Sequence, residues 1–108
     1  MPDHPEEKLD LITLIAQRGR VDDIVTAAES AGATGVTYFE AKGTGVRQKL
    51  GLKGFLIVPD KQVFLIVTKR HQTDAVFEAV SKAAHLDEPA KGFAYIHPID
   101  RAVGFLTS

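Results

Sequence analysis

The segment with the clearest chemical character is KGTGVRQKLGLKG, residues 42–54. Glycine recurs through it, and it carries Lys42, Arg47, Lys49 and Lys53 but no acidic residue. Glycine lets backbone N–H groups approach an anion closely, and the cations hold negative charge in place. The pattern therefore predicts a loop that binds phosphate or an acidic partner surface. It does not itself indicate catalysis, and a flexible hairpin connection with solubilising lysines is the alternative.

The rest of the chain offers few groups for catalysis or metal binding. It has no cysteine, which excludes disulfides and thiolate metal sites. There is no GxSxG motif, and the serines have no recognisable base nearby in the sequence. The histidines show no metal-ligand spacing such as HxxxH; they are His4, His71, His85 and His97. We therefore expect neither an enzyme nor a metal site.

The glycines of the cationic segment complete no common nucleotide motif. Gly43 and Gly45 follow a strand-like run, but no helix pattern opens after them, so the Rossmann fingerprint does not apply. The pattern GxxxxGK[ST] is also absent. The interval from Lys42 to Pro59 is long for a hairpin connection, and loops of that length are usually functional or disordered.

Two similar halves of the chain must position this loop. Runs of apolar and β-branched residues predict four strands, at residues 9–16, 34–41, 63–68 and 93–97. Helical spacing predicts two helices, at residues 21–31 and 74–85, and Thr73 is the expected N-cap of the second. Pro98 is expected to end the last of the four strands. The run VDDIVTAA of the first helix is echoed by TDAVFEAV in the second. This duplication predicts an α+β, ferredoxin-like βαββαβ fold, with a four-stranded antiparallel sheet and two helices on one face.

Length and charge limit the class of protein. A chain of 108 residues makes one domain, which we place at residues 8–108 after a short flexible lead over residues 1–7. The acidic start is unlike a signal peptide, and a net charge of −1 provides no global attraction to nucleic acid or anionic lipid. We expect a cytoplasmic protein with no nucleic-acid partner and no membrane insertion. Because two helices cover only one face of such a sheet, we expect self-association through the other face.

The order of these features resembles the PII signal-transduction family. The resemblance begins with a strand, a helix opened by Asp22-Asp23, an Ala-Gly pair, T-G-x-T and a K-G-x-G loop start. It continues through Arg47-Gln48, Pro59, the strand VFLIVT and the second helix, and covers about residues 8–105. The resemblance implies a ferredoxin-like homotrimer that binds adenine nucleotides in clefts between subunits. It also implies that the long loop, the T-loop, senses the nucleotide and often 2-oxoglutarate, and docks onto targets such as membrane transporters or metabolic enzymes.

The same resemblance implies particular site residues. The T-loop would span about residues 43–60, and a second loop that closes on phosphates, the B-loop, about residues 86–92. The expected ligand-binding residues are Leu14, Thr37, Lys42, Gly43, Thr44, Gly45, Arg47, Gln48, Ile66, Lys91 and Gly92. The expected partner-docking residues are Leu50, Leu52, Lys53, Phe55 and Leu56. The expected ligands are ADP, ATP, AMP, cyclic AMP or another small anion, with no required cofactor.

The chain also departs from the family pattern. Its T-loop is shorter than in the nitrogen-regulatory members and holds no tyrosine or serine, so we expect neither uridylylation nor seryl phosphorylation there. Phe93 follows Gly92 where the family places a phosphate-binding lysine, and the terminal Arg-x-Arg of the family is replaced by residues 104–106. Each lost charge-assisted contact is worth about 1.5–3 kcal/mol, which puts triphosphate binding in question.

Two other functions stay open on the sequence. The first is a ligand-independent interaction module that docks a partner through the same loop. The second is a metal-handling trimer of the similar CutA-like fold, which the lack of cysteine and of paired histidines disfavours.

Overall fold

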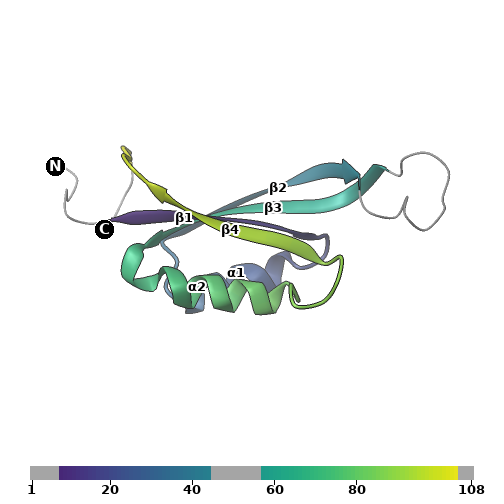
Figure 1. The fold of residues 1–108 in the computed structure, drawn as a ribbon, viewed down its shortest axis with the longest axis horizontal. Coiled ribbons are helices and arrows are strands. Elements are labelled where there is room, and N and C mark those ends of the chain that lie inside the picture. The colour runs from purple at the N-terminus through teal and green to yellow at the C-terminus, as the bar shows by residue number, and fades with distance from the viewer. Residues whose placement is uncertain (1–7, 45–56, 105–108) are drawn as a thin grey trace.

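The computed structural model describes residues 8–44 and 57–104. Four strands form one sheet in the order β2-β3-β1-β4, with every neighbouring pair antiparallel. The strands are β1 (Leu9–Gln17), β2 (Gly35–Thr44), β3 (Ile57–Lys69) and β4 (Gly92–Ile99). The helices α1 (Val21–Ser30) and α2 (Arg70–Ala83) lie side by side on one face of the sheet, as Figure 1 shows. The structure confirms the predicted ferredoxin-like fold.

The hydrophobic core fills the space between the helices and the sheet. Alternate residues of β1 and β3 point toward the helices, because successive side chains of a strand face opposite ways. The fully buried side chains include Ile12 and Leu14 of β1, Phe64 and Ile66 of β3, Ile24 and Ala28 of α1, and Val76 and Val80 of α2. Each large apolar side chain buried in this way contributes about 1.5–3 kcal/mol relative to exposure.

The opposite face of the sheet, which we call the open face, is largely apolar. Side chains of residues paired across an antiparallel ladder lie on the same side of the sheet. The registers therefore place a continuous apolar set on the open face, with Phe39 of β2, Val63, Leu65 and Val67 of β3, Leu11 and Ile15 of β1, and Phe93 and Tyr95 of β4. Both helices of the described chain lie on the other side (Figure 1).

Strands β2 and β3 extend into the segment that the sequence assigned to the long loop. They form a hairpin that projects well beyond the helices (Figure 1), and its ladder continues to the pair Thr44 and Ile57. The register shifts where Lys42 of β2 lies opposite two residues of β3, Pro59 and Asp60. Proline lacks the N–H that a ladder needs and is tolerated at such a bulge, so the strand continues past it. The residues at the two ends of the predicted loop, 43–44 and 57–60, therefore belong to the strands.

Helix α2 begins one turn earlier than the sequence predicted. It starts at Arg70 with Lys69 at the N-cap position, so the prediction of Thr73 as the N-cap is wrong. The hydroxyl of Thr73 is instead buried and lies 2.7 Å from a carboxylate oxygen of Asp10. The prediction that Pro98 ends β4 is also wrong, because an edge strand tolerates proline and pairing continues to Ile99.

Both helices end in the same backbone motif. In α1 the N–H of Ala33 donates to the carbonyl of Ala28, around Gly32 at φ 107°. In α2 the N–H of Leu86 donates to the carbonyl of Ser81, around His85 at φ 58°. These are Schellman motifs, which require a left-handed residue just after the helix. The duplication seen in the sequence therefore extends to the helix ends, although a histidine takes the second glycine's place.

Candidate functional site

One end of the sheet gathers the segments that the sequence singled out. Gln17 of β1 pairs with Lys61 of β3, and Lys61 pairs with Ala41 of β2. One residue further in, Ala16 of β1 pairs with Gly92, the first residue of β4. The strands on either side of the predicted T-loop and the junction of the predicted B-loop with β4 therefore lie at the same end of the sheet, which we call the loop end.

Three lysines at the loop end have no described anionic partner. Lys42 is exposed, and Lys61 and Lys91 are half-buried. Over residues 8–44 and 57–104, the ion pairs place no carboxylate within 4.0 Å of these three. The neighbouring Arg18 differs, because its guanidinium lies 3.8 Å from the carboxylate of Glu40. The three ammonium groups are therefore available to an anion that arrives from solution.

These lysines lie across the width of the sheet rather than in one cluster. Lys42 belongs to the edge strand β2, and Lys91 directly precedes the other edge strand, β4. Three strand spacings separate the two edges, which is about 14 Å. A ligand that contacts both lysines must either span the loop end or lie between two copies of the chain.

The sequence analysis did not select Lys61. It lies in the strand VPDKQVF just after the proline, where the sequence marked the end of a loop. Its place at the loop end follows from its pairing with Gln17 and Ala41, residues far away in the chain. A pattern of residue types along one strand carries no such information.

The segment predicted to be the B-loop enters β4 through a position that only glycine fits. Gly92 has φ 150°, and a Cβ built on it would lie 2.1 Å from the carbonyl oxygen of Ile15. Ala90, two residues earlier, has φ 63°, a left-handed conformation that is uncommon for alanine. The backbone around Lys91 is thus held in an unusual course by its packing against β1, as is common at ligand-binding loops.

Two residues of the predicted ligand set are core residues. The side chains of Leu14 and Ile66 are 0% exposed and pack between the sheet and the helices, so we leave them out of the site. They alternate onto the helix face because they pair with Phe64 and Val36, which lie on that side. Thr37, by contrast, is exposed on the open face, opposite Leu65.

The other predicted residues divide between the hairpin and the undescribed part of the chain. Gly43 and Thr44 belong to the β2 ladder beyond the bulge. The remaining predicted ligand-binding residues, Gly45, Arg47 and Gln48, lie outside the described residues. So do all predicted docking residues, Leu50, Leu52, Lys53, Phe55 and Leu56.

Comparison with known proteins identifies the family to which this chain belongs. The model of the family described as nitrogen regulatory protein P-II matches residues 9–107. The chain belongs to the P-II family. Among curated protein sequences, none matches it. The family assignment confirms the resemblance found in the sequence.

Solved structures show the same P-II fold. The structure of Bacillus subtilis GlnK in complex with ATP aligns with a TM-score of 0.70 at 16% identity, covering 86% of this chain and 83% of that one. Arabidopsis thaliana PII bound to citrate aligns with a TM-score of 0.64 at 23% identity, covering 90% and 82%. A Bacillus cereus protein related to NIF3 aligns with a TM-score of 0.69 at 16% identity. It contains the fold as one part, since the match covers 94% of this chain but 27% of that protein.

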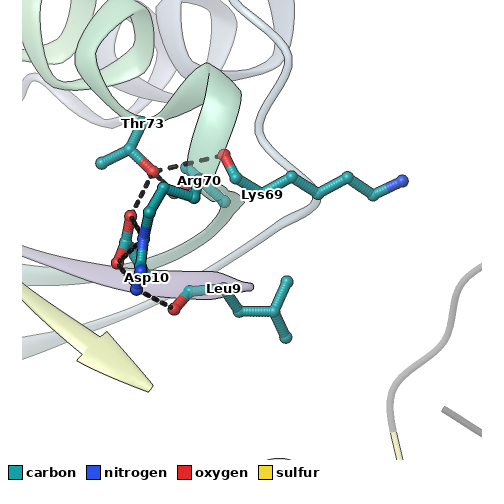
Figure 2. A network of polar contacts seen from close by, with 6 residues as sticks. Leu9, Asp10, Lys69, Arg70 and Thr73 are labelled. Atoms are coloured by element: carbon teal, nitrogen blue, oxygen red, sulfur yellow. Dashed lines mark hydrogen bonds and ion pairs between the residues drawn. The ribbon is translucent and has the colours of Figure 1, made fainter. Parts of the chain in front are cut away.

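A polar network at the opposite end of the sheet was not predicted. Arg70 of α2 donates from Nη2 to Oδ1 of Asp10 at 2.8 Å and from Nε to both carboxylate oxygens at 3.1 and 3.2 Å (Figure 2). Thr73 donates to Oδ2 of Asp10 at 2.7 Å, and Thr68 in turn donates to Thr73 at 2.6 Å. The network ties the start of β1 to the first turn of α2. The sequence signal for it is a single charged residue, Asp10, within a strand of mostly apolar residues.

The network shifts the titration of both charged groups. The hydrogen bonds from Arg70 lower the pKa of Asp10 most strongly; burial opposes this effect, while the bond from Thr73 and the guanidinium charge add to it. The hydrogen bond with Asp10 raises the pKa of Arg70. With its carboxylate ionised and satisfied, Asp10 stabilises the fold rather than offering a reactive group.

The described residues contain no group of three or more histidines, aspartates and glutamates that could hold a metal ion. Among the helices of the described part of the chain, none is both long and apolar enough to cross a membrane.

Proposed function

We propose that this P-II family chain is a non-catalytic regulatory protein that binds an adenine nucleotide or another small anion at the loop end. The observation that carries the proposal is the strand register, which brings the base of the T-loop, Lys61 and the Lys91-Gly92 junction to one end of the sheet. The three lysines there have no described carboxylate partner, and an anion would satisfy them.

We propose further that the chain assembles as a homotrimer with the ligand sites between copies. The apolar open face supports this, because a soluble monomer rarely exposes a large contiguous apolar surface. The separation of Lys42 and Lys91 across the sheet also supports it. A ligand held between copies can contact Lys42 of one copy and Lys91 of another without spanning the sheet.

The class of ligand follows from the loop end and from the relatives. The solved relatives were bound to ATP and to citrate, which share multiple negative charges on a small frame. This chain lacks the terminal arginines of the family pattern, so ADP, AMP, cyclic AMP or a small polyanion fits at least as well as ATP. Ligand binding would order the T-loop. The ordered loop would then control docking to a target, such as a membrane transporter or a metabolic enzyme.

Isothermal titration calorimetry with ATP, ADP, AMP, cyclic AMP and citrate tests the ligand site. At least one should bind the wild-type protein, and Lys42→Ala and Lys91→Ala should each weaken it about tenfold or more, since a charge-assisted contact is worth about 1.5–3 kcal/mol. Lys8→Ala is the matched control, because Lys8 is exposed at the opposite end of the sheet and should leave affinity unchanged. If none of the five compounds binds the wild-type protein, the proposal is contradicted.

The second candidate function is a ligand-independent docking module. It is favoured by the long β2–β3 hairpin, whose ladder continues beyond the helices to Thr44 and Ile57, and by the replacement of the family's terminal Arg-x-Arg. Capture of a target by the immobilised protein discriminates between the two. A target retained equally with and without each nucleotide supports the module, and a target released or recruited by one nucleotide supports the regulatory protein.

A further inference from the structure

An aromatic row runs along β4 on the open face and ends in a histidine. The ring centroids of Phe93 and Tyr95 are 5.5 Å apart, and those of Tyr95 and His97 are 5.4 Å apart. The register pairs His97 with Leu11 of β1, which in turn pairs with Val67 of β3. His97 therefore lies in an apolar row of the sheet, on the side away from the helices.

Among the described residues whose side chains are placed, residues 8–42 and 61–104, the ionisable groups of the open face are few and none is acidic. On β4 they are Tyr95 and His97, and on β3 they are Lys61 and Lys69 at the two ends of the described ladder. The open-face positions of β1 and β2 hold no ionisable side chain within the described residues. Asp10 faces the helices and is already bonded to Arg70, and Asp100 and Arg101 follow β4 as exposed residues.

This composition determines how protonation of His97 changes the free energy of covering the open face. When a second copy covers the face, an uncharged imidazole at His97 can be buried among Leu11, Tyr95 and Val67 at modest cost. The described side chains of the open face offer no carboxylate to an imidazolium there. Burying an unpaired charge is strongly unfavourable. Lys61 and Lys69 differ from the imidazolium, since a long side chain at the margin of an interface can keep its ammonium group in water.

We propose that His97 makes self-association through the open face dependent on pH, with the neutral imidazole permitting assembly and the protonated one opposing it. The inference rests on the assembly proposed above. Assembly is then complete at high pH and weakens as the pH falls.

Sedimentation velocity on a dilution series of the full chain at pH 8.0 and pH 5.5 tests the proposal. The concentration at the midpoint of dissociation should rise at least about tenfold at pH 5.5 for the wild-type protein. His97→Gln should show equal midpoints at the two pH values. His71→Gln, at an exposed position on α2, is the matched control and should keep the wild-type shift. Circular dichroism checks folding at each pH, and His97→Thr replaces His97→Gln if the latter does not fold.

The outcomes separate this inference from the assembly that it rests on. A wild-type monomer at both pH values overturns the proposed assembly itself. An oligomer with the same midpoint at both pH values overturns only the role of His97. Tighter association at pH 5.5 also overturns it, because a carboxylate from the neighbouring copy would then be pairing with the imidazolium. A shift that persists in His97→Gln assigns the effect to another group.

Discussion

At the scale of single residues, the Asp10 network shows how a buried charge is made stabilising. The carboxylate of Asp10 is 5% exposed and accepts hydrogen bonds from Arg70 and Thr73, so its charge does not remain unsatisfied. The guanidinium of Arg70 is about half exposed, which limits the desolvation cost of the pair. Residues about sixty positions apart thereby fasten the start of α2 to the sheet.

Removing this carboxylate should give a pH-dependent loss of stability. The pKa of Asp10 is lowered in the folded protein, so the network's stabilisation is fully present above the ordinary carboxyl pKa of about 4 and is lost as pH falls below it. Asp10→Asn should therefore lower the melting temperature by several degrees at pH 7, and the gap to wild type should narrow toward pH 3. Thermal denaturation followed by circular dichroism measures it.

Asp74→Asn is the matched control for this prediction, because Asp74 is exposed on the same helix. It should leave the melting temperature nearly unchanged. A gap between wild type and Asp10→Asn that stays constant from pH 7 to pH 3 would contradict the role of the ionised carboxylate.

Gly92 should be intolerant of any side chain. Gly92→Ala places a Cβ 2.1 Å from the carbonyl oxygen of Ile15, so β4 or the B-loop has to move, at a cost of about 2 kcal/mol or more. Chemical denaturation measures the loss. Gly35→Ala is the control, because its Cβ would meet nothing within 4 Å, and it should change stability little. Equal stability of the two variants would mean that the close approach to Ile15 is absent.

At the scale of elements, the two helices end in the same backbone motif, but the steric cost of the motif differs between them. Gly32 takes the left-handed conformation without steric cost, whereas His85 takes it at φ 58° despite its Cβ. The N–H donors of both motifs are satisfied at 2.9–3.1 Å, so the backbone course is the same in each. The end of α2 is therefore a position where the sequence is not optimal for the fold.

Glycine at this position should stabilise the protein. His85→Gly relieves the strain at the end of α2 and should raise the free energy of unfolding by about 0.5–1 kcal/mol after the added entropy of the unfolded chain is subtracted. Urea denaturation at pH 7 measures the change. His85 also lies 3.4 Å from the carboxylate of Glu88, so Glu88→Gln is measured alongside. Destabilisation by His85→Gly without any effect of Glu88→Gln would contradict the argument.

The bounds of the elements depended on pairing that local sequence does not report. The types and order of all six elements follow from local periodicity, because amphipathic spacing is a property of neighbouring residues. The length of the β2–β3 hairpin does not follow from local periodicity. Proline by itself predicts the end of a strand, and β3 continues through Pro59 only because a bulge accommodates it. Thr73 suits an N-cap by residue type, but its hydroxyl is engaged by Asp10 and Thr68.

At the scale of the whole molecule, the open face is a broad apolar surface that neither helix of the described chain covers. Phe39 and Tyr38 are neighbours in β2, each 49% exposed, on opposite faces of the sheet. Phe93 and Tyr95 extend the apolar surface to the other edge, with 59% and 39% of their areas exposed. The assembly proposed above would cover this surface with further copies of the chain.

A charge on the open face should therefore block assembly. Phe39→Arg should convert the protein from oligomer to monomer in size-exclusion chromatography with light scattering, because a desolvated unpaired guanidinium opposes burial. Tyr38→Arg, at a position of equal exposure on the helix side, should leave the oligomer intact. An unchanged oligomer in Phe39→Arg would place the interface elsewhere.

The candidate site was predictable in part. The lysines and glycines of the loop end, Lys42, Lys91 and Gly92, stand out by residue type and by their order in the chain. Lys61 does not, because its place at the loop end arises from pairing with Gln17 and Ala41. Leu14 and Ile66 were selected from the resemblance, yet they are core residues, since the face that a strand buries is decided by where the helices pack.

The sequence by itself determined the order of elements, the duplicated fold and the family. Each of these follows from residue types at short separation or from the order of short motifs along the chain. Only the tertiary structure decided which strand faces are covered, how far the hairpin extends and that Asp10 meets Arg70 and Thr73. These depend on contacts between residues far apart in the chain, and the free energy of such contacts is set by the packing of the whole molecule.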